Sequence, residues 1–146
     1  MEKQPAYFEI FDGGDILRVE VIGINDNASN DTKNPQNLDA EITVKACTFH
    51  GQYGAEFMPF DFYRFRQQLV SLLYNLEKTA TFNCMEGYLE IAVIIEPDDY
   101  INVKIKACDV PGIGGELSFT LSLEKSDIEN IVQQLDNILE LYPIPN

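Results

Sequence analysis

One stretch of the sequence, residues 115–142, limits the possible fold more than any other. Its first part alternates apolar and polar side chains from Leu117 onward, which is the two-residue period of a half-buried strand. Its second part predicts a helix that starts at Ser126, where Glu129 completes a capping box, and that ends before Pro143. This helix carries an apolar stripe at helical spacing, made of Ile128, Ile131, Val132, Leu135, Ile138, Leu139 and Tyr142. The fold must therefore contain a sheet with an amphipathic helix packed against it.

Seven further segments show strand patterns, and short turns join most of them. The glycine pair in Asp12-Gly13-Gly14-Asp15 and the proline in Pro97-Asp98-Asp99 are typical turn residues. Strands joined by such short turns pair in the antiparallel direction. The predicted strands span residues 6–11, 16–24, 40–49, 53–57, 79–84, 89–95 and 101–107.

A first helix is predicted after the fourth of these strands. Asp61 has the chemistry of an N-cap, and Phe60 and Phe65 can form a hydrophobic staple across it. The core stripe of this helix consists of Phe62, Phe65, Leu69, Leu72, Leu73 and Leu76. Its pattern matches the last helix at an offset of 66 residues, which is compatible with a duplication or with two merely similar strand–helix units.

These elements predict an α+β fold in a single domain spanning residues 1–146. The expected architecture is a mainly antiparallel, curved sheet of about seven or eight strands, with two helices covering one face and the other face in water. We expect Lys104 or Lys106 on the wet face to pair with Glu90. The Asn-rich segment 25–37 is expected to be an exposed loop, and its resemblance to a calcium loop fails because the central glycine and closing glutamate are missing.

Charge and terminal sequence restrict the class of protein. The formal net charge is −14, which argues against direct binding of nucleic acid or anionic membranes and permits a basic protein partner. The first residues lack the apolar core of a signal peptide, and no apolar run is long enough to span a membrane. We therefore expect a cytoplasmic protein.

No catalytic, metal or cofactor site is predicted. His50 is the only histidine and is expected at a surface turn, and a strand would place Cys47 on the opposite face from it. The three cysteines have no metal-type spacing and are expected to be buried or half-buried thiols. The glycine run 112–115 precedes a strand, whereas a phosphate loop precedes a helix. We expect no enzyme activity and no cofactor.

The two helices differ beside their core stripes. The first helix has an apolar flank of Tyr63, Val70 and Tyr74, which we expect to be covered by a loop, by the other helix or by a second subunit. The second helix has an acidic flank at the equivalent positions, which we expect to face water. The candidate partner-binding residues are this flank and one acidic turn, comprising Glu129, Asp136, Glu140, Asp98 and Asp99. Positive charge falls instead on the predicted outer sheet face, at Lys45, Lys104 and Lys106.

From about Asp39 to the end, the order of elements resembles the WapI-type immunity proteins of bacterial polymorphic-toxin systems. The resemblance rests on the strand 40–44, the amphipathic helix 62–76, the strand segments 80–82, 88–91 and 117–121, the helix start at Ser126 and the terminal Leu141-Tyr142-Pro143. It implies a protein that binds and neutralises a cognate toxin domain, commonly a nuclease.

Two other readings stay open at this stage. One is a small-molecule hydrolase or ligand-binding domain built on the same sheet, and the other is a subunit of a homo-oligomer without independent activity. The single histidine and the absence of metal-type spacing weigh against a hydrolase.

Overall fold

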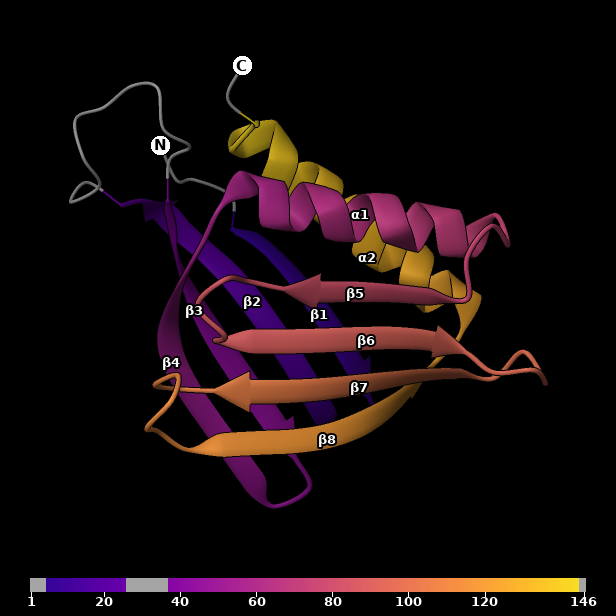
Figure 1. Cartoon of the computed structure of the whole chain (residues 1–146), viewed down its shortest axis with the longest axis horizontal. Helices are drawn as coiled ribbons and strands as arrows, with labels where there is room; N and C mark the ends of the chain where they lie inside the picture. Colours follow the sequence, from indigo (N-terminus) through magenta and orange to yellow (C-terminus); the bar gives the residue numbers. More distant parts are fainter. Residues whose placement is uncertain (1–4, 26–36, 145–146) are drawn as a thin grey trace.

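The computed structural model describes residues 5–25 and 37–144. The chain forms four strands and a helix, and then repeats this order (Figure 1). The first half contains β1 (Ala6–Asp12), β2 (Asp15–Ile24), β3 (Leu38–Ala46), β4 (Phe49–Phe57) and α1 (Pro59–Leu73). The second half contains β5 (Thr79–Asn83), β6 (Leu89–Ile95), β7 (Ile101–Cys108), β8 (Glu116–Leu123) and α2 (Lys125–Leu141). The predicted antiparallel α+β fold with two helices is confirmed.

The strands form two separate four-stranded sheets, where the sequence predicted one. Their orders are β1-β2-β3-β4 and β5-β6-β7-β8, and every pair is antiparallel. The alternating pattern identified which face of each strand is buried, but it did not identify which strands pair. The helix α1 separates β4 from β5 in the chain. In Figure 1 the sheets lie one in front of the other with their strands crossing, and both helices lie along the side formed by β1 and β5.

The core lies between the inner faces of the sheets and beneath the helices. Phe82 of β5 is its centre, because its ring lies 5.4–5.9 Å from the rings of four other phenylalanines. These are Phe8 of β1, Phe57 of β4, and Phe62 and Phe65 of α1. All five are almost completely buried. Strands and a helix from both halves therefore share one aromatic cluster.

Each helix packs against the first strand of the opposite half. The helix α1 contacts β5, and α2 contacts β1. The side chain of Gln68 on α1 accepts a hydrogen bond from the Thr81 backbone N–H at 2.9 Å. The side chain of Gln134 on α2 accepts one from the Glu9 backbone N–H, also at 2.9 Å. The helices thus satisfy part of the backbone at two edge strands, whose open N–H groups would otherwise invite pairing with another chain.

The predicted helix starts were wrong. The helix α1 is preceded by Met58, whose backbone N–H donates to Asp61 at 2.9 Å, so Asp61 is the third helical residue and not the N-cap. The helix α2 starts in the same way, with the N–H of Glu124 donating to Asp127 at 2.9 Å, so Ser126 lies inside the first turn. In each half a single residue separates the last strand from the helix, and this short connection decides the start.

Two side-chain placements also differ from expectation. Phe60 does not form a staple with Phe65, because Phe65 is buried while Phe60 is 46% exposed and stacks on Tyr63. Leu76 is 74% exposed, because α1 ends before it. The expected loop between β2 and β3 and the rejected calcium pattern lie mostly in residues 26–36, outside the described residues.

Candidate protein-binding site

The acidic flank of α2 is exposed, as its sequence predicts. Glu129, Asp136 and Glu140 all lie on the solvent side of the helix. Asp136 is also tied to α1, because its carboxylate accepts a hydrogen bond from Nε of Arg66 at 2.8 Å. A second nitrogen of Arg66 donates to the side chain of Gln67 at 2.7 Å. The ion pair joins the acidic flank of α2 to the neighbouring surface of α1.

The structure places Asp98 and Asp99 in the exposed turn between β6 and β7, apart from the acidic flank. Asp99 adopts a positive φ of 66°, and Asp98 accepts a hydrogen bond from the Tyr100 N–H at 3.1 Å. Asp99 lines an open depression of about 690 Å³ with the carboxyl side chains of Asp12, Glu124 and Asp127. The turn therefore lies close to the first turn of α2, and the lining of this depression includes none of the three flank residues.

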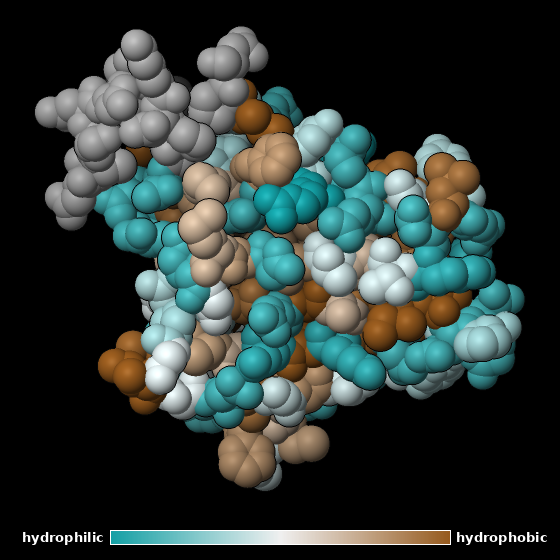
Figure 2. Space-filling view, viewed as in Figure 1, coloured by the Kyte–Doolittle hydropathy of each residue, from teal (hydrophilic) through white to brown (hydrophobic). Residues whose placement is uncertain are grey.

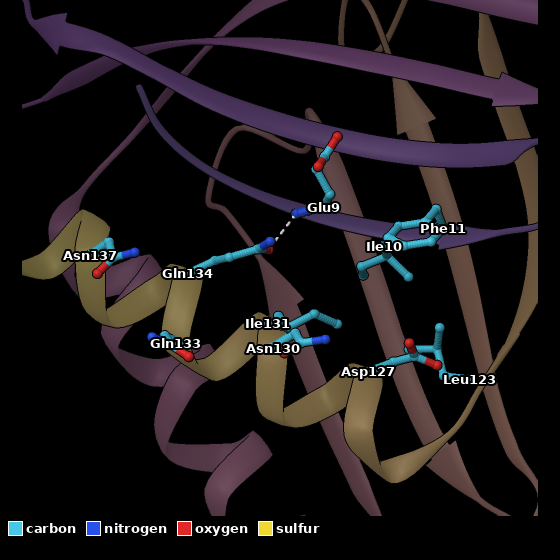
Figure 3. Close-up of a pocket in the computed structure, with 10 residues that line it drawn as sticks. All are labelled: Glu9, Ile10, Phe11, Leu123, Asp127, Asn130, Ile131, Gln133, Gln134 and Asn137. Carbon is cyan, nitrogen blue, oxygen red and sulfur yellow. Dashed lines mark hydrogen bonds between the residues drawn. The ribbon is translucent and has the colours of Figure 1, made fainter. Parts of the chain in front are cut away.

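A groove between β1 and α2 was not predicted from the sequence. It has a volume of about 260 Å³, and Figure 3 shows four amide side chains of α2 along it. They are Asn130, Gln133, Gln134 and Asn137. Their i, i+3, i+4 and i+7 spacing is the sequence signal that could have revealed one polar helix face. The side-chain oxygen of Gln134 accepts the backbone N–H of Glu9 in β1, so this residue of the groove has a structural role.

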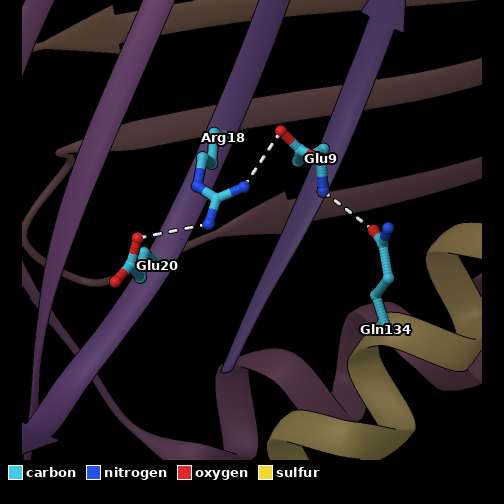
Figure 4. A network of polar contacts seen from close by, with 4 residues as sticks. All are labelled: Glu9, Arg18, Glu20 and Gln134. Carbon is cyan, nitrogen blue, oxygen red and sulfur yellow. Dashed lines mark hydrogen bonds and ion pairs between the residues drawn. The ribbon is translucent and has the colours of Figure 1, made fainter. Parts of the chain in front are cut away.

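An ionic network lies on the outer face of β1 and β2 (Figure 4). The guanidinium of Arg18 lies between two carboxylates, 3.1 Å from Glu9 and 3.3 Å from Glu20. It also lies 4.0 Å from the centre of the Tyr7 ring. Partial burial lowers the pKa of Arg18, but hydrogen bonds with Glu9 and Glu20 outweigh it and leave the pKa raised. Both terminal nitrogens of this guanidinium therefore face carboxylates of its own sheet.

Both tyrosines of the apolar flank of α1 are exposed, so within the single chain neither a loop nor the other helix covers them, and cover by a second subunit stays a prediction. Tyr63 is 37% exposed and Tyr74 is 73% exposed, while Val70 is half-buried. The rings of Phe60 and Tyr63 are stacked, with centroids 6.1 Å apart, and the guanidinium of Arg64 lies 4.9 Å from the centre of the Phe60 ring. The beginning of α1 thus carries an ordered aromatic and cationic cluster at the surface.

The lysines of the second sheet lie on its outer face, but their predicted partner was wrong. Lys106 lies across from Glu90 in the strand register, yet its ammonium group pairs with Glu116 at 3.6 Å. Lys104 and Lys106 line a shallow depression of about 600 Å³ together with hydroxyl side chains such as Thr120. Lys45 is exposed on the other sheet. The outer sheet faces therefore carry mixed charge, in contrast to the acidic flank of α2.

The reactive side chains are spread over the molecule. His50 is exposed within β4 and not in a turn, because the chain turns earlier, at Cys47, which has a positive φ of 58°. Cys47 is exposed, against the prediction for it, whereas Cys84 and Cys108 are buried. Among residues 5–25 and 37–144, no group of three or more histidine, cysteine, aspartate or glutamate side chains is placed to hold a metal ion. In the same residues, no helix is long and apolar enough to cross a membrane.

Among families of known proteins, the model of the immunity protein WapI-like family matches residues 8–143. None of the curated proteins compared with the chain matches it.

Three solved structures resemble the fold with low sequence identity. The MRP1/MRP2 structure from Trypanosoma bruciei has a TM-score of 0.49 at 14% identity and covers 95% of this chain and 86% of that chain. The plant transcriptional regulator PBF-2 has a TM-score of 0.47 at 13% identity, with coverages of 97% and 84%. WHY1 from Arabidopsis thaliana has a TM-score of 0.48 at 10% identity, with coverages of 97% and 93%. At these scores the likenesses carry no argument about what the chain does.

Proposed function

Because the chain belongs to the immunity protein WapI-like family, we propose that it neutralises one cognate toxin domain by binding it directly, without catalysis. The observation that carries this proposal is the family match over residues 8–143, which includes every strand of both sheets in whole or part and both helices. An immunity protein acts in the compartment where its toxin does harm. The compartment we propose is the cytoplasm of a bacterium that makes the toxin in a polymorphic-toxin system.

The charge of the chain supports a basic partner. A formal charge of −14 repels nucleic acid and attracts a positively charged protein surface. A toxin domain that cleaves nucleic acid needs such a positive surface to bind its substrate. We therefore propose a nuclease domain as the partner. An acidic protein bound to this nuclease domain would pair with the same positive charges and would thereby exclude the nucleic acid.

We propose that the exposed carboxylates predicted from the sequence contribute to this binding. Glu129, Asp136 and Glu140 form a continuous flank on α2, and Asp98 and Asp99 form a separate acidic turn. Charges at the rim of an interface act mainly on the association rate. Their expected role is to draw the toxin toward the helix side of the molecule.

The test uses the toxin domain encoded next to this chain. That domain is produced in cells with and without the chain, and survival is scored; the purified pair is then examined by calorimetry for a one-to-one complex. Survival that depends on the chain, together with a complex, is the expected result. An unrelated nuclease domain serves as the specificity control. Protection without a complex, or no protection at all, would overturn the proposal.

A further inference from the structure

The two halves of the molecule provide an internal comparison of their helices. At an offset of 66 residues, Met58 matches Glu124 before each helix, and Asp61 matches Asp127 as the residue that accepts its backbone N–H. The buried stripes match as well, as do the two glutamines that bind the opposite edge strands. Side chains that the fold requires therefore recur in both helices. A large side chain that does not recur has no demonstrated role in the fold.

Three exposed aromatic residues of α1 fail to recur in α2. Phe60, Tyr63 and Tyr74 have fractional exposures of 46%, 37% and 73%. The equivalent residues of α2 are Ser126, Glu129 and Glu140, which are all exposed and polar. The same helix geometry, start and packing thus form with polar side chains at these places. The three aromatic side chains at the matching positions of α1 remain 37–73% exposed, so they stabilise the fold less than buried ones would.

Two of these rings contact each other within the chain. Phe60 and Tyr63 stack on each other, and the guanidinium of Arg64 lies over the Phe60 ring. All three belong to the first two turns of a helix, which fixes their backbone. Aromatic and arginine side chains dominate the binding energy of protein interfaces, and rigid side chains lose little entropy when they are buried there.

The aromatic cluster lies near one end of the acidic flank. The helix α1 starts on the side of the molecule where α2 ends (Figure 1), and Glu140 lies in the last turn of α2. The Arg66–Asp136 ion pair joins the middle of α1 to the second half of α2. Leu141, near the end of α2, is 55% exposed. Figure 2 shows apolar atoms gathered at the surface where α1 begins and α2 ends, with hydrophilic atoms beside them. An apolar centre next to acidic side chains is the composition of a protein interface with a charged rim.

We infer that the outer surface of the helix pair is the toxin-docking surface, with Phe60 and Tyr63 as its apolar anchor and Glu129, Asp136 and Glu140 as its acidic rim. This inference rests on the proposed function. The partner surface that fits it is a basic one with an apolar pocket, which receives the stacked rings while its cations face the carboxylates of α2. The anchor governs how slowly the complex dissociates, whereas the rim governs how fast it forms.

The test variant is Phe60→Ser with Tyr63→Ser, which removes the anchor without changing the net charge. Its control is Phe49→Ser with Ile113→Ser, which removes two apolar side chains of greater exposure, 67% and 88%, from the start of β4 and from the connection between β7 and β8. Circular dichroism and the melting temperature verify the fold of each. Tyr63→Glu, which copies the residue at the equivalent place in α2, is a second variant should the double one unfold.

Binding to the toxin domain of the neighbouring gene is followed by surface plasmon resonance. We expect the test variant to dissociate at least about tenfold faster at a similar association rate, while the control stays within about twofold of the native chain. If the native chain binds and the test variant dissociates equally slowly, the docking surface is elsewhere and the proposed function stands. An equal loss in test and control would also overturn the inference. Absence of binding by the native chain would remove the proposed function itself.

Discussion

Gln68 and Gln134 have the same relationship to opposite halves of the protein. Each lies on a helix and accepts, at 2.9 Å, the backbone N–H of an edge strand that belongs to the other half. The two glutamines are separated by the offset of 66 residues that relates the helix starts. A side-chain amide at this place can satisfy a strand edge without adding another strand. The helices therefore close the two sheets at β1 and β5.

Replacing either glutamine by alanine should weaken the fold locally. We expect Gln68→Ala and Gln134→Ala each to lower the free energy of unfolding by about 1 kcal/mol, because a partly buried N–H loses its partner. Gln133→Ala, at an exposed neighbouring position, is the control. Chemical denaturation measures the loss, and hydrogen exchange should show faster exchange at the Thr81 amide in the first variant and at the Glu9 amide in the second. Unchanged exchange at those amides would contradict the assigned role.

Removal of the ring at the centre of the core should be far more costly. The expected loss for Phe82→Ala is about 3–5 kcal/mol, because the side chain is buried among four other aromatic rings and leaves a cavity. Total stability is only about 5–15 kcal/mol for a typical domain, so much of this variant should be unfolded on mild heating. Phe49→Ala, at a 67% exposed position, should change stability by less than about 0.5 kcal/mol. Similar melting temperatures for the two variants would contradict the packing described.

Asp61 should make stability depend on pH. Burial raises the pKa of its carboxyl above the ordinary 3.8, while the Met58 N–H and the charge of Arg64 lower it by less. The folded protein thus holds the proton more tightly than the unfolded chain, so the contribution of Asp61 is fully present below pH 3.8 and is lost as the pH rises through the folded pKa.

This dependence is measured as the difference in unfolding free energy between the native chain and Asp61→Asn at several pH values. We expect the native chain to lose stability relative to the variant as the pH rises from 3.8 toward neutrality. Asp127→Asn, at the equivalent position of α2, is the control. It measures the stability that is lost when the carboxylate at a helix start is replaced by an amide. A difference that grows in favour of the native chain with rising pH would have the wrong sign.

The acidic rim should act on association. Replacing Glu129, Asp136 and Glu140 together by lysine should slow binding to the toxin domain by about tenfold or more at low ionic strength, and added salt should reduce the difference. Replacement of Glu41, Glu90 and Glu116 by lysine changes the net charge equally at exposed places on the sheets and serves as the control. Equal slowing in both variants would indicate that only net charge matters and not the position of the flank.

His50 and the cysteines are expected to have no part in protection. His50 and Cys47 are exposed near the connection of β3 and β4, whereas Cys84 and Cys108 are buried. His50→Ala and Cys47→Ser should therefore protect cells as well as the native chain does. Complete loss of protection by either variant, with its melting temperature unchanged, would show that this end of the first sheet takes part in binding.

Residue periodicity predicted the elements well, because each strand and helix has one dry side. Leu121 and Leu123 of β8 are buried, as are Ile128, Ile131, Leu135 and Ile138 of α2. The pattern did not predict which strands pair, since each strand buries the same face whether the eight strands form one sheet or two. The helix starts also escaped prediction: Ser126 is a better N-cap by chemistry than Glu124, but the end of β8 at Leu123 leaves room for only one residue.

The candidate surface was predicted only in part. The exposure of Glu129, Asp136 and Glu140 followed from helical spacing, because the buried stripe fixes the opposite side of α2. The exposure of Tyr63 and Tyr74 did not, because aromatic side chains in a helix are more often covered than left in water. The sequence analysis expected this aromatic flank to be covered by a loop, the other helix or a second subunit, and in the single chain Tyr63 and Tyr74 are exposed.

Because each helix packs against the other half, the two edge strands β1 and β5 are covered at different stages of synthesis. Gln68 and its partner in β5 are only 13 residues apart, so that edge can close as soon as the chain reaches it. Gln134 and its partner in β1 are 125 residues apart. During synthesis on the ribosome, β1 emerges early, and its outer backbone groups lack their helix partner until α2 has emerged. Chains truncated before α2 leave the edge of β1 uncovered. They should therefore be degraded or aggregate and should not accumulate as a smaller folded protein.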